Sequence, residues 1–185
     1  MKPRHVVLVV LDAYGGKIRG KTMLQKVCYF ADVLASLGLG FKAHYYGPFS
    51  PAIEQAVGEL KSLGFIEEKR LGFGVVQNEF FGEMRRYDYE LTSDGEKVVE
   101  ELQRRGGEKL DNVRTTVENI KKCGDPDYRE LSVAAKAFFI VRKQGGAVTV
   151  PQIKEQARAL GWELSEQDVD KAVGLLEGLG LARRQ

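Results

Sequence analysis

The chain has 185 residues, of which 43% are hydrophobic and 29% are charged. These proportions are typical of globular proteins, so they exclude a largely disordered chain and a fibrous one. The 28 basic and 26 acidic residues leave a net charge of only +2, so any surface that attracts nucleic acid must be local.

The few cysteines and histidines exclude several kinds of site. Cys28 and Cys123 stand far apart with no CxxC pair, which excludes a disulfide scaffold and a zinc ribbon. His5 and His44 are the only histidines, so a histidine-rich metal site is excluded too. The longest apolar run, Val6 to Leu11, is too short for a membrane span and does not resemble a signal peptide. We therefore expect a cytoplasmic protein that does not bind membranes.

Glycines and apolar periodicity predict two helices at the start of the chain. Residues 4–14 form the first helix, and the glycines after it turn the chain, with Ile18 in a very short strand. A second helix is predicted from Thr22 to about Leu37, because apolar residues recur there at spacings of three and four. Thr22 and Gln25 have the spacing of a capping box at its start.

A third helix and a β-hairpin are predicted next. Ser50 is expected to cap the helix, with Pro51 at its first position. An extended segment then runs from Phe65 towards Gly72 and Gly74, which suit a turn, and the return strand covers about Tyr87 to Leu91.

Two more helices follow the hairpin. Ser93 and Glu96 have capping-box spacing at the start of the first. The second is polar except for a narrow stripe that indicates either packing on the chain itself or a homodimer contact, formed by Leu110, Val113, Val117 and Ile120.

The last third of the chain contains three helical patterns after the turn at 123–127, with Trp162 expected in their core. They are Leu131 to Lys143, Val150 to Leu160 after the cap Thr149, and Gln167 to Leu179 after the cap Ser165. Residues 57–70 resemble residues 173–184 at a constant offset, each reading as a helix, a stop at glycine and an extended segment. This internal similarity suggests two related modules, although so few matched positions could also arise by chance.

The predicted fold is mainly α (α+β). Three helices followed by a hairpin is the order of a winged helix-turn-helix, and we expect a second, helical winged-helix-like module after it. The expected division is a winged-helix-like domain over 1–105 with a hairpin wing, a linker helix and turn over 106–127, and a three-helix domain over 128–185.

A phosphate-binding loop is the alternative for the first segment. GGKIRGKT, residues 15–22, fits the G-x-x-x-x-G-K-[ST] motif, in which Lys21 would neutralise phosphates and Thr22 would bind magnesium. That interpretation needs Val6 to Leu11 as a parallel strand and a later apolar strand ending in aspartate, and the pattern favours neither. No set of acids or nucleophiles points to catalysis, so we expect a non-catalytic protein without a cofactor.

Three motifs carry a family resemblance that spans most of the chain. GGKIRGKTMLQKVCYF, HYYGPFS and YELTSDG resemble the YwgA-like group of uncharacterised prokaryotic proteins, and more distantly the Panacea or SocA-type antitoxin and adaptor domain. The matched residues are Lys21, Leu24, Gln25, Lys26, Tyr29, Tyr46, Gly47, Pro48, Phe49, Ser50, Tyr89, Leu91, Thr92 and Gly95. The resemblance implies a winged-helix-like fold and a regulatory or interaction role, without known catalytic residues.

Local charge suggests where nucleic acid would bind. Residues 1–30 contain six basic residues and one acid, whereas residues 31–91 contain six basic residues and nine acids. Phosphate contacts are predicted for Lys17, Arg19, Lys21 and Lys26 near the glycines, and for Lys69, Arg70, Arg85 and Arg86 on the hairpin. Base contacts would fall to Ser50, Gln55 and Lys61, although two glutamates share their helix and would repel DNA. Alternatively, these charges form ordinary solvated faces.

The motif HYYGPFS is the second candidate surface. Tyr45, Tyr46 and Phe49 surround Gly47 and Pro48, a composition suited to partner binding. Alternatively, their rings pack under the hairpin. The favoured function is a DNA-binding transcriptional regulator of the winged-helix type. The alternatives are a protein-protein interaction adaptor or antitoxin-like module and, less favoured, a P-loop nucleotide binder.

Overall fold

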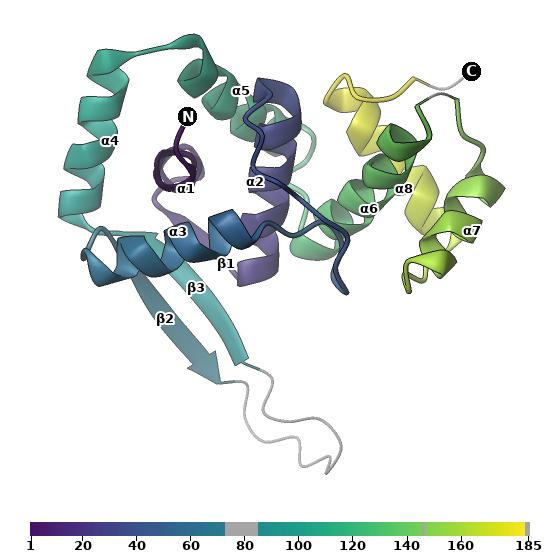
Figure 1. Cartoon of the computed structure of the whole chain (residues 1–185), viewed down its shortest axis with the longest axis horizontal. Coiled ribbons are helices and arrows are strands. Elements are labelled where there is room, and N and C mark those ends of the chain that lie inside the picture. Colours follow the sequence, from purple (N-terminus) through teal and green to yellow (C-terminus); the bar gives the residue numbers. More distant parts are fainter. Residues whose placement is uncertain (73–84, 146, 184–185) are drawn as a thin grey trace.

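The computed structural model describes residues 1–72, 85–145 and 147–183 of the chain. It is mainly helical with a small antiparallel sheet, which confirms the predicted mainly α (α+β) class (Figure 1). The elements are α1 (Pro3–Ala13), β1 (Lys17–Arg19), α2 (Lys21–Ala35), α3 (Pro51–Ser62), β2 (Ile66–Gly72), β3 (Arg85–Leu91), α4 (Ser93–Arg105), α5 (Glu108–Lys122), α6 (Tyr128–Gln144), α7 (Val150–Ala159) and α8 (Glu166–Gly178). Within the described residues, no helix has both the length and the apolar character needed to cross a bilayer.

Helix α1 lies at the centre of the first half of the molecule. Figure 1 looks almost along its axis, with α2, α3, α4 and α5 around it. Its six consecutive residues Val6 to Leu11 are all buried, as expected of a helix that is hydrophobic on every side. Burial on all faces therefore outweighs the weak helix propensity of its four valines. The P-loop interpretation needed a strand at these residues, and they form a helix.

Helix α2 begins differently from the prediction. Gly20, with a φ of 93°, precedes its first residue, and no side chain caps it. The predicted capping box of Thr22 and Gln25 is wrong, because the Gln25 side chain is buried and bonds to the backbone of Ser50. Ser50 does cap α3 as predicted, since its Oγ accepts a hydrogen bond from the N–H of Ile53.

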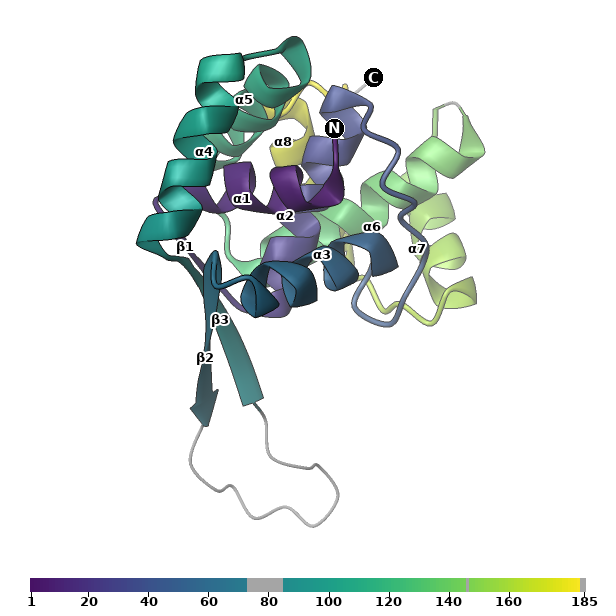
Figure 2. The same ribbon diagram turned by 60° about the vertical axis from the view of Figure 1, so that its left-hand side comes forward.

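The sheet has the order β1-β3-β2, with both pairs antiparallel. Ile18 pairs with Tyr89 and Ile66 pairs with Leu91, so the base of the hairpin lies against the helices while its far end projects from the body (Figure 2). Gly72 ends β2, and the rest of the predicted turn, including Gly74, falls outside the described residues.

Helix α5 is packed on its own chain. The apolar stripe faces α1 and α2, and all four of its side chains are buried: Leu110, Val113, Val117 and Ile120. The prediction that this stripe forms a homodimer contact is therefore wrong, because its four side chains are already buried and expose almost no apolar surface to a second copy. The interval 106–127, expected to be a linker helix and turn, contains this helix, which is buried along one face, and the segment leading to α6.

Helices α6, α7 and α8 form a second group, in which α6 packs on α2 as well as on α8. Thr149 and Ser165 cap α7 and α8 as predicted. Helices α3 and α8 end alike, because Phe65 N bonds to Leu60 O at 3.0 Å and Leu181 N bonds to Leu176 O at 2.8 Å. The similar segments 57–70 and 173–184 therefore end their helices with the same kind of hydrogen bond, made at equivalent positions.

We predict that Gly95→Ala is strongly destabilising. Thr92, rather than the predicted Ser93, caps α4, and the helix approaches the chain so closely that a Cβ at Gly95 would lie 2.1 Å from the carbonyl oxygen of Phe65. Because that atom belongs to the backbone, the substitution should lower the free energy of unfolding by about 2–3 kcal/mol. Chemical denaturation measures it.

Gly58→Ala is the matched control for this prediction. Gly58 is also helical, but a Cβ there meets no heavy atom within 4 Å. Alanine should raise stability by about 0.5–1 kcal/mol, because it favours the helix. Equal effects of the two substitutions would contradict the close approach of α4 to Phe65.

Candidate functional site

The segment from His44 to Ser50, here called the aromatic turn, is held from one side by buried polar side chains of α2. Gln25, only 3% exposed, donates from Nε2 to Ser50 O at 3.2 Å and accepts at Oε1 from Ser50 N at 3.0 Å. Lys26, only 2% exposed, donates from Nζ to Pro48 O at 2.7 Å. These bonds satisfy backbone groups of a loop that has little regular secondary structure of its own.

The second group of helices holds the same turn from the other side. Ser132 Oγ on α6 donates to Tyr46 O at 2.8 Å, and Trp162 Nε1 donates to His44 O at 2.7 Å. The turn therefore has hydrogen bonds to both halves of the molecule. Its position depends on contacts between residues up to 118 positions apart in the sequence.

Gly47 lies at the tightest point of the turn. Its φ is +96°, and a Cβ there would lie 3.0 Å from Lys136 Cγ and 3.3 Å from Lys26 Cε. The positive φ strongly favours glycine, and any larger residue would also crowd two lysine side chains. The turn thus brings Lys26 of α2 and Lys136 of α6 to the same backbone position.

The held turn presents two tyrosine rings to solvent. Tyr45 is 71% exposed and Tyr46 is 60% exposed, and their rings meet edge to face with centroids 4.8 Å apart. Phe49 is partly buried, with its ring 5.1 Å from that of His44. The alternative that the tyrosines pack under the hairpin is therefore wrong, and we call the exposed rings the tyrosine pair.

A cavity of about 270 Å³ lies beside Tyr46. Its walls come from the start of α2 and from the aromatic turn, namely Lys21, Thr22, Gln25, Lys26, His44, Tyr46 and Phe49. Burial, together with a smaller effect of the nearby charge of Lys136, lowers the pKa of Lys26 to about 7. Burial also lowers the pKa of Lys136, which Asp168 partly opposes.

Two residues predicted to contact nucleic acid are buried inside the protein. Lys26 holds the aromatic turn and cannot reach the phosphates of a duplex, and Ser50 is fully buried as the cap of α3. Both assignments are corrected. Packing of α2 against the turn is the reason, and only the tertiary structure reveals it.

Most of the other predicted DNA contacts lie on the surface beside acids. The Nζ atoms of Lys17 and Lys69 lie 3.8 and 2.5 Å from the same Glu90 carboxylate oxygen. Lys21 Nζ lies 2.5 Å from a Glu54 carboxylate oxygen, and Lys61 Nζ lies 2.8 Å from one of Glu68. Arg86 Nε lies 2.8 Å from an Asp88 carboxylate oxygen, and Gln55 Nε2 donates to Glu59 Oε1 at 2.9 Å. Arg19 and Arg70 are exposed, and Arg85 belongs to β3 although its side chain lies outside the described residues.

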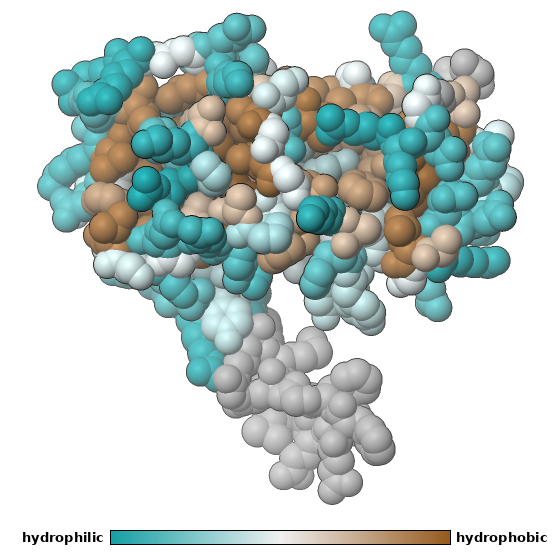
Figure 3. All heavy atoms as spheres, in the orientation of Figure 1, coloured by the Kyte–Doolittle hydropathy of each residue, from teal (hydrophilic) through white to brown (hydrophobic). Residues whose placement is uncertain are grey.

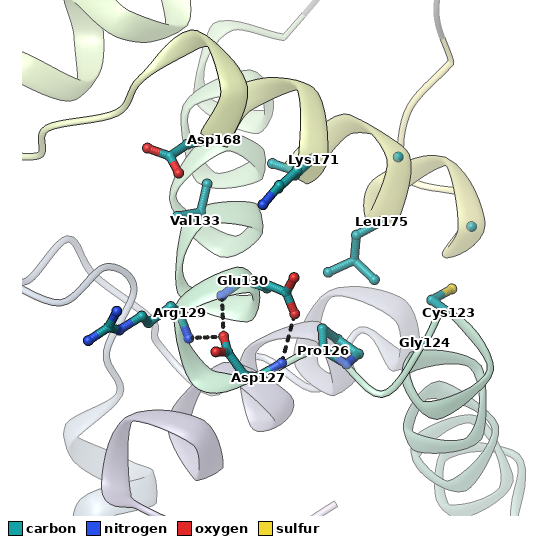
Figure 4. Close-up of a pocket in the computed structure, with 13 residues that line it drawn as sticks. Cys123, Gly124, Pro126, Asp127, Arg129, Glu130, Val133, Asp168, Lys171 and Leu175 are labelled. Atoms are coloured by element: carbon teal, nitrogen blue, oxygen red, sulfur yellow. Dashed lines mark hydrogen bonds between the residues drawn. The ribbon is translucent and has the colours of Figure 1, made fainter.

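A larger cavity, of about 840 Å³, lies between the start of α6 and α8 (Figure 4). Its polar groups mostly stabilise the helix start. Asp127 accepts from the N–H groups of Arg129 and Glu130, and the Glu130 carboxylate accepts from Asp127 N at 3.0 Å. Among the described residues, no group of three histidine, cysteine or acidic side chains is arranged to hold a metal ion.

Sequence patterns indicated Tyr45, Tyr46 and Phe49 as a candidate surface but not the residues that hold them. Ser132 and Trp162 come from the second half of the chain, where no local pattern indicates contact with the turn. The available signal was the pair of motifs LQK and YGPFS, which the structure brings together through Gln25 and Lys26.

No protein-family model matches the chain. It is similar to the uncharacterized protein YwgA of Bacillus subtilis (strain 168), with 29% identity over 101 residues. The aligned region covers 54% of this chain and 56% of the relative, so the chain spans about half the length of the protein it matches. The similarity confirms the resemblance to YwgA, while the more distant resemblance to the Panacea or SocA-type domain stays a prediction.

We predict that the stability of the protein rises between pH 7 and pH 9. The pKa of Lys26 falls from 10.5 to about 7 on folding, so the unfolded chain binds more protons in this range and deprotonation favours the folded state. Lys26→Met should reduce the slope of unfolding free energy by about 1 kcal/mol per pH unit. Urea denaturation at several pH values measures this slope.

The chosen pH range and a control variant separate the contribution of Lys26 to this slope from those of other titrating groups. Burial raises the pKa of Cys28 above its ordinary 9.0, which opposes the effect at higher pH, and Lys136 leaves a smaller slope of the same sign. Lys122→Met, on the exposed face of α5, should retain the full slope. An unchanged slope in Lys26→Met would show that this lysine is not the titrating group.

Proposed function

We propose that this chain is a non-catalytic protein-interaction module that binds a partner protein through the tyrosine pair. The observation that supports this most directly is the exposure of Tyr45 and Tyr46, at 71% and 60%, on a turn with hydrogen bonds to α2, α6 and Trp162. Tyrosine is among the residues that contribute most to the energy of protein interfaces.

The fixed position of the turn makes it suitable for binding. A flexible loop loses conformational entropy when a partner immobilises it, and this loss weakens the complex. The carbonyls of His44, Tyr46 and Pro48 are already held by side chains from the segment between α7 and α8, from α6 and from α2, respectively. The tyrosine pair therefore binds with a smaller entropic cost than rings on a mobile loop.

We also infer that the first half of the chain is a winged-helix module. Support comes from its order of elements, α1, β1, α2, α3 and the hairpin of β2 and β3, and from the sheet order β1-β3-β2. Such a fold serves DNA binding in some proteins, but function depends on the site rather than on the fold.

DNA binding is the second candidate, favoured by the hairpin that projects from the body with Arg70 exposed on β2. Figure 3 shows hydrophilic side chains along the described part of this hairpin. The acids that accompany Lys17, Lys21 and Lys69 weaken this candidate, because they reduce the attraction of those lysines for phosphate.

We predict that Tyr45→Ala with Tyr46→Ala removes partner binding without unfolding the chain. Both rings are exposed, so their loss should leave the free energy of unfolding within about 0.5 kcal/mol of the wild type. Loss of two aromatic anchors should weaken the complex by about 30-fold or more. A photo-crosslinking residue at position 45 identifies the partner in cells, and binding to the purified partner measures the affinity.

Leu63→Ala is the matched control, because Leu63 is also exposed, at 55%, but lies at the end of α3 opposite to Ser50 and the turn. This variant should bind the partner as the wild type does. A partner that binds the double variant and the wild type equally would overturn the proposed function.

For duplex DNA, we expect only weak, sequence-independent binding, with a Kd above about 10 μM near 150 mM salt. Lys17→Glu with Arg19→Glu should change this Kd little, because Glu90 already lies beside Lys17. Fluorescence anisotropy with random and genomic duplexes measures the affinity. A submicromolar Kd lost in this double variant would instead establish the second candidate.

A further inference from the structure

The cavity beside Tyr46, here called the lysine pocket, has a polar floor and an open rim. Lys26 and Gln25 are buried and form the floor, whereas Lys21, His44 and Tyr46 are exposed and form the rim. The amide of Gln25 already makes two hydrogen bonds to Ser50. The charged group on the floor that still has donors to offer is the ammonium of Lys26.

The positive charge of Lys26 has no matching negative charge in the described residues. Its Nζ donates to one acceptor, the carbonyl oxygen of Pro48, and no described carboxylate forms an ion pair with it. An ammonium group carries three donors, so two remain available. A buried ammonium without an anion is costly, and an incoming anion removes that cost.

Neighbouring lysines differ from Lys26 in this respect. Lys21 on the rim forms an ion pair with Glu54 at 2.5 Å. Lys136 lies next to Gly47 but does not line the pocket. Among the lysines that line the pocket, only Lys26 therefore has a charge that no described carboxylate balances.

We propose that the lysine pocket binds the side-chain carboxylate of an acidic residue in the partner protein that docks on the tyrosine pair. This inference rests on the proposed function, because Tyr46 belongs both to the rim of the pocket and to the docking surface. The partner segment would place an aspartate or glutamate next to the residue that contacts the rings.

The charge and the volume of the pocket favour a carboxylate. One unbalanced ammonium matches one carboxylate, whereas a phosphate monoester carries a charge of about −1.5 to −2 at neutral pH. A cavity of about 270 Å³ is smaller than the usual site for a free small molecule, but it accommodates one side chain. The rim also supplies aromatic surface from Phe49 and Tyr46 for the methylene groups of that side chain.

Two small probes test the pocket without knowledge of the partner. N-acetyl-glutamate amide carries the proposed group, and N-acetyl-glutamine amide has nearly the same shape without the charge. The assigned NMR amide signals of Gly47 and Thr22 in the wild-type protein report binding at pH 6, where Lys26 is protonated. We expect saturable shifts with the glutamate probe at a Kd of about 1 mM, and binding at least tenfold weaker with the glutamine probe.

The same titrations are repeated with Lys26→Met, after circular dichroism has verified that the variant is folded. It should lose the response to the glutamate probe, whereas Lys122→Met should retain it. If Lys26→Met does not fold, the comparison of the two probes on the wild-type protein still decides the result. Equal shifts with both probes, no shifts, or tighter binding of inorganic phosphate than of the glutamate probe would each overturn the carboxylate pocket.

The partner experiment separates this inference from the proposed function. A partner that needs the tyrosine pair but binds Lys26→Met and wild type equally supports the interaction module and overturns the pocket. If the glutamate probe binds but partner binding does not need the tyrosine pair, the proposed function fails, and the pocket's role in docking fails with it.

Discussion

The hydrogen bonds from buried Lys26 and Gln25 to the backbone of the aromatic turn are the constraint on which the candidate site depends. The turn is an irregular segment next to the body of the protein, and its backbone groups need partners that it cannot supply itself. Long polar side chains of α2 supply them on one side, and Ser132 and Trp162 supply them on the other. The same contacts bury a lysine, join the two halves of the molecule and leave two tyrosine rings in solvent.

The electrostatics of the surface separate the two candidate functions. Counted along the sequence, the first 30 residues are strongly basic. In the folded chain, acids from α3 and the sheet, including Glu54 and Glu90, lie within ion-pair distance of these lysines. Exposed pairs of this kind add little stability, but they reduce the field that would attract a polyanion. This arrangement favours a protein partner over a duplex.

Helix α1 illustrates how tertiary burial decides local structure. A run of valines followed by glycines is compatible with a strand and a phosphate-binding loop, and the motif alone does not separate this from a helix. Packing of α2, α3, α4 and α5 around the segment removes every face of it from water. A helix satisfies its backbone hydrogen bonds within itself, so it suits a segment that is buried on every side and pairs with none of the described strands.

Local patterns in the sequence determined the helices, the hairpin and the caps Ser50, Thr149 and Ser165, because apolar periodicity and capping act over a few residues. They also indicated Tyr45 and Tyr46 as a candidate surface. Only the tertiary structure decided which polar residues of α2 are buried, where the apolar stripe of α5 packs, and that Trp162 reaches His44. These outcomes depend on contacts between distant segments, and a residue's neighbours in the sequence carry no information about them.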